Sequence, residues 1–217
     1  MKLHSVMISY NRLELTKQAI KSYVETVSVP YTLMVVDNGS AQDVTDWILR
    51  NAAAFSYVLL GSNKYPGFAC NEGFSRAPDD ATVLHRADND WMFLPGWCEE
   101  VEERFAANQL LGQVGLRTGE QELHNGHNVG GNCAFRRQLW DEGLRWKQTP
   151  WPKIKTAGYT EDSFMSPEVA RRGWEWGRVE KPCIESLADE NPEDPYYVKS
   201  WEDRGILENA KKAYGIE

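Results

Sequence analysis

The chain has 217 residues and a formal net charge of −8, with a pI near 5.1, and 41% of its residues are hydrophobic. This length allows one large domain or at most two small ones around a substantial core. No apolar run approaches the roughly 20 residues that cross a bilayer, so we expect no integral membrane segment. The acidic balance does not support a global attraction to nucleic acid or anionic membranes, although it is compatible with a local basic patch.

The opening residues, MKLHSVMISYN, predict a first strand, because they lack the length and the cleavage site of a signal peptide. We therefore expect an intracellular, cytoplasmic protein. The cysteines are widely spaced and form no Cys-x-x-Cys pair of the kind that indicates zinc or redox chemistry. We expect reduced thiols at all four positions, Cys70, Cys98, Cys133 and Cys183.

Strands alternate with helices over the first half of the chain. A strand over 3–9 precedes an amphipathic helix over 13–27, and a second apolar strand, from 31, ends at Asp-Asn-Gly-Ser before a helix over about 42–53. A third strand over 56–62 leads into a loop rich in glycine and asparagine with a short helix, and a fourth strand over 81–87 ends at two aspartates. This alternation predicts an α/β fold with a mainly parallel sheet and right-handed crossovers.

The second half is less regular. A helix over 95–108 begins with proline, and a strand over 111–119 follows it. A glycine-rich turn, short strand and helix are predicted over 127–144, an acidic loop opening a helix over 159–174, and a final strand over 175–186. An acidic loop over 189–195 and a helix over 197–215 close the chain.

Polar residues follow each of the four predicted parallel strands. In a doubly wound sheet, ligands bind beyond the carboxyl ends of the strands, where helix N-termini point their amide groups outward. One aspartate there is readily explained as a helix cap or turn former. Four polar strand ends together favour a binding site, formed by Tyr10, Asn11 and Arg12, by Asp37 and Asn38, by residues 63–67, and by Asp88 and Asp90.

The pair Asp88 and Asp90, in the stretch RADND, predicts a divalent-metal site. Mg²⁺ and Mn²⁺ prefer oxygen ligands and combine one or two carboxylates with substrate phosphate oxygens. Such a metal neutralises a leaving diphosphate. A solvated turn at the strand end is the alternative.

A second acidic site, Glu161 and Asp162, lies at the predicted start of a helix. The two carboxylates could cap that helix and interact favourably with its dipole. Alternatively, an aspartate that faces the cleft could act as general base and accept the proton of an attacking hydroxyl.

Residues between the two acidic sites have open interpretations. Gly130 and Gly131, beside Asn132, form a flexible backbone segment that other groups can approach closely. The segment either lines a pocket or makes a tight turn into a strand. Arg136 and Arg137 either approach a phosphate or cap the next helix. Most tryptophans are expected in the core, but three could stack on a sugar or base: Trp91, Trp146 and Trp151.

Taken in order, these motifs resemble those of the GT-A glycosyltransferases, in particular the family 2 type that transfers sugars from nucleotide diphosphates. The resemblance covers about residues 3–185 and is carried by VMISYNRLELTKQAIKSY, LMVVDNGSAQD, NKYPGFACNEGFSRA, RADND, VGGNCAFRRQLWDEGL and YTEDSFMSPEVARRGW. It implies a GT-A, Rossmann-like central sheet flanked by helices in one domain over 1–217. A nucleotide-binding half would cover about 1–95, an acceptor half about 96–188, and a C-terminal acidic loop and helix 189–217.

Carried over residue by residue, the resemblance implies roles for these positions. Asp90 would be the principal metal ligand, with Asp88 beside it, and Mn²⁺ or Mg²⁺ the cofactor. Asp162 would be the general base, with Glu161 next to it in the acceptor pocket. The nucleotide-sugar donor would lie against Ser9, Tyr10, Asn11, Arg12, Asp37, Asn38, Asn63, Gly67, Asn71, Asp88 and Asn89.

The implied reaction is a single in-line displacement at the anomeric carbon, with inversion of configuration and a donor that we expect to be UDP-linked. One feature departs from the family pattern. Many members carry a histidine after the strand that follows the Glu-Asp helix, whereas the corresponding stretch here is CIESLADENPED. Glu185, Asp189 or water could complete the metal shell instead.

Other functions remain open from the sequence. A retaining GT-A enzyme or a nucleotidyltransferase would use a similar acidic metal site, and a non-catalytic sugar- or nucleotide-binding module would keep the fold without turnover. The acceptor hydroxyl could belong to a glycan, a lipid-linked sugar, a protein side chain, a metabolite or a modified nucleic-acid base, because fold analogy does not choose between them.

Overall fold

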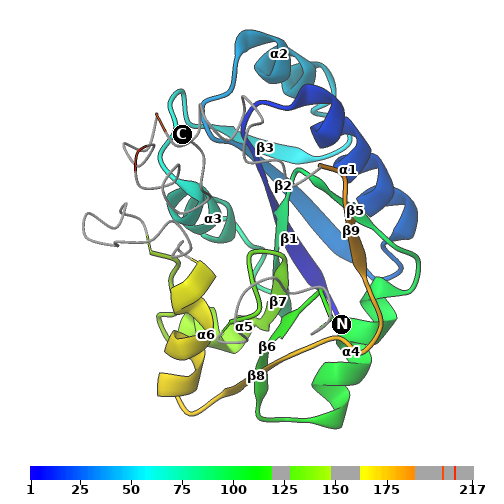
Figure 1. The fold of residues 1–217 in the computed structure, drawn as a ribbon, viewed down its shortest axis with the longest axis vertical. Coiled ribbons are helices and arrows are strands. Elements are labelled where there is room, and N and C mark those ends of the chain that lie inside the picture. The colour runs from blue at the N-terminus through cyan, green and yellow to red at the C-terminus, as the bar shows by residue number, and fades with distance from the viewer. Residues whose placement is uncertain (119–127, 148–161, 189–201, 203–207, 209–217) are drawn as a thin grey trace.

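The computed structural model describes residues 1–118, 128–147, 162–188, 202 and 208. A seven-stranded sheet forms its centre, in the order β3-β2-β1-β4-β7-β6-β8 (Figure 1). β7 runs antiparallel to its neighbours and the other pairs are parallel, as the alternation predicted. The strands are β1 (Leu3–Ser9), β2 (Tyr31–Asp37), β3 (Ser56–Leu59), β4 (Val83–Asp88), β6 (Leu111–Gly115), β7 (Cys133–Arg136) and β8 (Glu175–Arg178).

Helices cover both faces of the sheet and create two apolar cores. One core lies between the sheet and three helices, α1 (Leu13–Thr26), α2 (Gln42–Arg50) and α4 (Trp97–Ala107). The other lies between the sheet and α3 (Pro66–Phe74), α5 (Arg137–Asp141) and α6 (Asp162–Arg171) (Figure 1). Near-continuous burial of β1 and of the second half of β2 fits this arrangement, because a parallel sheet is covered on both faces.

Strand β4 places two neighbouring polar residues in opposite cores, because successive side chains of a strand point to opposite faces. His85 lies among Tyr23, Phe93 and Trp97, where burial lowers its pKa to about 3. Its Nδ1 lies 2.9 Å from the Ser5 hydroxyl. Arg86 points to the opposite face, where it is 3% exposed.

The final predicted strand is instead two strands in two sheets. After β8 the chain passes Pro182, which has no N–H to donate to a ladder, and β9 (Ile184–Ser186) pairs antiparallel with β5 (Trp91–Phe93). The backbone N–H of Leu187 donates to the Asp90 carbonyl at 2.8 Å. Leu187, just after β9, therefore lies beside the Asp-x-Asp segment.

All four cysteines are free and buried, as predicted. No helix in the part of the chain that the structure describes is long and apolar enough to cross a membrane. The predicted C-terminal loop and helix fall outside the described residues, except for positions 202 and 208.

Candidate functional site

The ends of β1 and β2 are held together by hydrogen bonds through Asn11. Its backbone N–H donates to the Ser40 hydroxyl at 2.8 Å, and its side-chain oxygen accepts from the backbone N–H of Ala41 at 2.9 Å, at the start of α2. Asn11 and Arg12 both have positive φ angles, 55° and 54°. Consecutive non-glycine residues in this region cost free energy, and such strain concentrates at functional sites.

The ends of β2 and β3 are joined in the same manner. The Asn38 amide donates to the Asn63 side-chain oxygen at 3.1 Å, and the Asn38 side-chain oxygen accepts from the backbone N–H of Lys64 at 2.9 Å. Asp37 is 2% exposed and accepts hydrogen bonds from the backbone N–H of Ser40, in the loop that follows it, and from the hydroxyl of Thr45 in α2. Burial raises the pKa of Asp37.

Asn89 connects the acidic segment after β4 to the first loop. Its amide donates to the Thr16 hydroxyl at 2.8 Å and to the Asn11 carbonyl at 3.3 Å, while the Ser9 hydroxyl lies 3.3 Å from that of Thr16. Tyr10 is buried beside this group. Eight residues predicted to contact the donor thus meet at one edge of the sheet: Ser9, Tyr10, Asn11, Arg12, Asp37, Asn38, Asn63 and Asn89.

Asp90 pairs with Arg12 across a distance of 2.9 Å. Burial, followed by the negative charge of Asp88, raises the pKa of Asp90 to about 6, although the Arg12 guanidinium opposes that rise. The carboxylate is therefore in an environment that favours an additional positive charge.

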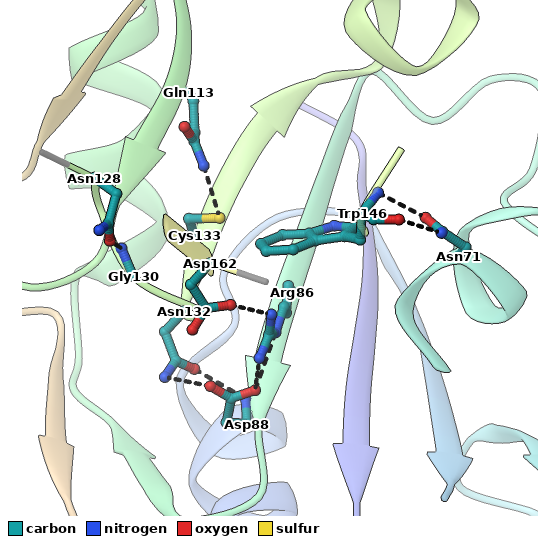
Figure 2. A network of polar contacts seen from close by, with 10 residues as sticks. All are labelled: Asn71, Arg86, Asp88, Gln113, Asn128, Gly130, Asn132, Cys133, Trp146 and Asp162. Carbon is teal, nitrogen blue, oxygen red and sulfur yellow. Dashed lines mark hydrogen bonds and ion pairs between the residues drawn. The ribbon is translucent and has the colours of Figure 1, made fainter. Parts of the chain in front are cut away.

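Asp88, the other half of the Asp-x-Asp pair, faces Arg86 from the same strand. The Arg86 Nε donates to the Asp88 Oδ1 at 3.1 Å (Figure 2). Asn132 holds Asp88 from the next strand segment, because its side-chain oxygen accepts from the Asp88 backbone N–H at 2.9 Å. The two carboxylates of the pair thus have different partners.

Asp162, the predicted base, forms an ion pair with the same guanidinium, through Arg86 Nη1 (Figure 2). It is the first residue of α6, as the sequence predicted. The helix is fixed to the sheet by buried Ser166, whose hydroxyl donates to Gln113 of β6 at 2.9 Å and accepts from the backbone N–H of Val129 at 3.2 Å. Arg86 therefore joins Asp88, on its own strand, to Asp162, which lies 76 residues further along the chain than Arg86.

Arg86 is supported by an aromatic ring and a close backbone. Its guanidinium carbon lies 4.6 Å from the ring centroid of Trp146. Trp146 is only 2% exposed, so its ring is not presented to a sugar or base. Asn71 holds the Trp146 backbone with two hydrogen bonds, of 2.9 and 3.0 Å (Figure 2). A Cβ on Gly131 would lie 2.5 Å from Asp88 Oδ2 and 2.9 Å from Arg86 Nη2, so only glycine allows this approach.

The remaining predicted positions have these locations. Gly67 in α3 packs against the Lys147 carbonyl, which a Cβ would meet at 1.7 Å, and the Asn71 amide is used by Trp146. Arg136 donates to the backbone carbonyls of Leu111 and Phe105 and makes no side-chain capping hydrogen bond to α5, and Arg137, the first residue of α5, pairs with Asp141 along the helix. Trp91 lies under the Arg117 guanidinium. Glu161, Trp151 and Asp189 lie outside the described residues.

Sequence reasoning did not select Arg86 as a functional residue. The available signal was a charged residue inside an apolar strand, two positions before an aspartate and therefore on the same face. A buried cation requires an anionic partner, so the pattern could have indicated an ion pair with Asp88. The second partner, Asp162 of α6, could not be predicted from the sequence, because it lies far from Arg86 in the chain.

A divalent cation fits part of this site. The raised pKa of Asp90 and the nearby Asp88 carboxylate are features that a bound cation would relieve. Within the described ranges, no group of three or more His, Cys, Asp or Glu side chains could hold a metal. Glu185 is exposed in β9, where it pairs with Met92. A metal held by the Asp pair would therefore complete its shell with donor phosphates and water.

Comparison with protein-family models matches residues 5–125 to the model described as glycosyl transferase family 2, which is more than half of the chain. No curated protein sequence matches the chain.

Solved glycosyltransferase structures share the fold at low sequence identity. TarS from S. aureus superposes with a TM-score of 0.67 at 14% identity, over 91% of this chain and 38% of that one. The 1–349 fragment of TarS, in complex with UDP-GlcNAc, superposes with a TM-score of 0.66 at 13% identity, over 99% of this chain and 73% of the fragment. The mannosyltransferase PcManGT from Pyrobaculum calidifontis, in complex with GDP-Man and Mn²⁺, gives 0.68 at 16% identity, over 100% of this chain and 65% of that one. The chain thus spans about two fifths of the length of TarS and about two thirds of that of PcManGT.

Proposed function

The chain belongs to glycosyl transferase family 2 and is a glycosyltransferase with the GT-A fold, and from this premise we propose that it transfers a sugar from a nucleotide-diphosphate donor to an acceptor hydroxyl with inversion of configuration. A UDP-linked donor is the primary candidate, since one similar structure holds UDP-GlcNAc, and a GDP-linked donor is the comparison. The observation that carries the proposal is the ion-paired group in which Arg86 joins Asp88 to Asp162.

On the donor side, the strand-end loops would hold the nucleotide. The hydrogen-bonded loops around Asn11, Asp37 and Asn63 lie at the carboxyl edge of the sheet, where doubly wound folds bind nucleotides. Arg12 lies beside Asp90, and its guanidinium would face the side on which the donor phosphates bind. Asp90 and Asp88 would hold Mn²⁺ or Mg²⁺, which when bound supplies positive charge to the leaving diphosphate.

On the acceptor side, Asp162 would accept the proton of the attacking hydroxyl. A general base must lie within hydrogen-bond reach of that proton, so its carboxylate has to be held in place before the reaction. Arg86 provides this restraint and is a positioning residue: it is buried, backed by Trp146, and shared with Asp88 of the donor side. An in-line displacement needs the leaving group and the base on opposite faces of the sugar, and this shared group would fix their relative placement.

Donor binding is tested by thermal unfolding of the chain with UDP, GDP and dTDP, each with and without Mn²⁺. A ligand that binds the folded state raises the melting temperature by mass action, and we expect the largest rise with UDP and Mn²⁺ together. A melting temperature that responds to none of the nucleotides would contradict the proposal.

The reaction type is tested by the products. Inversion of the anomeric configuration, seen by NMR, with release of a nucleoside diphosphate is the expected result. Retention would indicate the retaining alternative, release of pyrophosphate a nucleotidyltransferase, and donor binding without turnover over an acceptor screen a binding module.

A further inference from the structure

A cavity of 280 Å³ lies along α6, the helix that begins with Asp162. We name it the α6 pocket. It is lined by the segment after α5 and by one side of α6 with the residue that follows it, including Arg145, Trp146, Lys147, Phe164, Glu168 and Arg172. Trp146 is also the ring that supports Arg86, so the pocket and the Arg86 ion pairs share a wall.

The charge of the α6 pocket is opposite to that of the whole chain. Its lining contains three cations and one carboxylate, a net charge of +2, in a protein with a net charge of −8. A local positive field of this kind raises the concentration of anionic ligands at the site.

The carboxylate of the pocket is already compensated. Glu168 forms ion pairs with both Arg171 and Arg172, and the hydrogen bond from Arg172 is the main cause of its lowered pKa. The Nη2 of Arg172 also lies 3.4 Å from the Gly143 carbonyl. Glu168 therefore orients Arg172 through direct contact, whereas the Lys147 ammonium acts on Glu168 only through its charge, as the smallest of the causes that lower the Glu168 pKa.

The other two cations of the lining, Arg145 and Lys147, remain available. The Arg145 guanidinium lies 3.6 Å above the Trp140 ring, and its Nη1 donates to the carbonyls of Trp140 and Leu144 at 2.7 Å. This fixes the plane of the guanidinium, while its other nitrogens donate to no group in the part of the chain that the structure describes. The Lys147 ammonium likewise forms no hydrogen bond or ion pair with the described residues.

We propose that the α6 pocket binds a phosphate group carried by the acceptor, so that the substrate is a phosphorylated alcohol or sugar. This inference rests on the proposed function, because it names the acceptor of that reaction. A phosphate monoester carries a charge of about −1.5 to −2 at neutral pH, which matches the +2 of the lining. A fixed arginine fork with a lysine point charge suits phosphate oxygens, and Phe164 offers apolar contact to the attached carbons.

The position of the pocket gives the binding a catalytic use. A phosphate held along α6 would place the attached hydroxyl group near the helix start, where Asp162 lies, and restrict its orientation before transfer.

The test uses calorimetric titration of the full chain with glycerol 3-phosphate, glycerol and glycerate at low ionic strength. We expect saturable binding of glycerol 3-phosphate, weakened by added salt, and no binding of glycerol. Replacing both available cations, Arg145→Met with Lys147→Met, should weaken that binding about ten-fold or more, because each charged hydrogen bond is lost without removing the stem. Lys181→Met, which removes an exposed lysine outside the pocket, is the matched control and should bind normally.

Lys147→Met alone keeps the test valid if the double variant does not fold, since the Lys147 side chain is exposed; it should still weaken binding several-fold. Absent binding of glycerol 3-phosphate, binding unchanged in the variants, or equal binding of glycerate would each overturn the phosphate assignment. UDP binding, measured on the same samples, is independent of the α6 pocket. Its presence together with any of these results leaves the proposed function intact, whereas its absence contradicts the proposed function itself.

Discussion

The two sides of the candidate site are held together in different ways. On the donor side, many hydrogen bonds between neighbouring loops share the task, as with Asn11 to Ser40 and Ala41, and Asn38 to Asn63 and Lys64. On the base side, Asp162 depends on the single guanidinium of Arg86, which it shares with Asp88 of the donor side. Distributed hydrogen bonds tolerate the loss of one member, whereas a shared buried cation does not, because its removal leaves two carboxylates without compensation.

The largest effect is expected for Asp162→Asn. The amide cannot accept the acceptor proton as a base, so transfer should fall about 10²- to 10⁴-fold, while UDP binding stays unchanged because the donor loops are untouched. Initial rates with saturating donor, together with a UDP thermal shift, measure both. Asp79→Asn, at an exposed position, is the control. Full activity of Asp162→Asn would remove the base assignment.

Arg86→Met tests the shared cation directly. The substitution leaves Asp88 and Asp162 close together without their partner, and the free energy of unfolding should fall by about 3 kcal/mol. Urea unfolding measures the loss, and Arg50→Met, an exposed arginine in α2, should change stability by less than about 0.5 kcal/mol. In the double variant with Asp162→Asn the further loss of activity should be small, since Arg86 acts through Asp162. Additive effects would argue against the positioning role.

Asp90→Asn separates the effect of this carboxylate on metal binding from its effect on the stability of the fold. The folded chain has a raised Asp90 pKa of about 6, against 3.8 for the ordinary group, so this carboxyl's contribution to stability is present below about pH 4 and is lost as pH rises through 6. At about pH 7.5, without metal, the variant should therefore be more stable than the parent chain by about 3 kcal/mol, with no gain at pH 4. Mn²⁺ with UDP should stabilise the parent chain alone. A variant that loses stability at high pH would contradict this account.

Gly131→Ala tests the close backbone approach on the base side. The added methyl would meet the Asp88 carboxylate at 2.5 Å and Arg86 at 2.9 Å, so one of them must move, at a cost of about 1 to 2 kcal/mol in stability and a loss of transfer activity. Gly177→Ala in β8 is the matched control, because its nearest neighbour lies at 3.4 Å. Equal effects of the two substitutions would mean that the contact is not important.

Asn38→Ala gives the smallest expected effect and tests the donor side. It removes two hydrogen bonds of a buried amide, but the surrounding loops retain theirs, so the free energy of unfolding should fall by about 1 kcal/mol. Urea unfolding compares it with Arg86→Met under the same conditions. If Asn38→Ala lowered the free energy of unfolding as much as Arg86→Met does, the donor side would not be the more tolerant of the two sides.

Much of the donor side could be predicted, since a strand period and a strand end are local properties of the chain. Apolar runs ending at polar residues placed Asn11, Asp37, Asn38 and Asn63 at one edge of a parallel sheet, where the structure has them. The weakest prediction was the final strand, because hydrophobic pattern alone does not show that β8 and β9 pair with different partners.

The sequence by itself determined the order of strands and helices, the family resemblance and the acidic segments, because each depends on residues that are neighbours in the chain. Only the tertiary structure decided that Arg86 lies between Asp88 and Asp162, and that Arg145 and Lys147 line a cavity along the same helix. Those contacts join segments far apart in the sequence. They depend on the antiparallel insertion of β7, which carries Gly131 and Asn132 to the end of β4, and on the packing of α6 through Ser166.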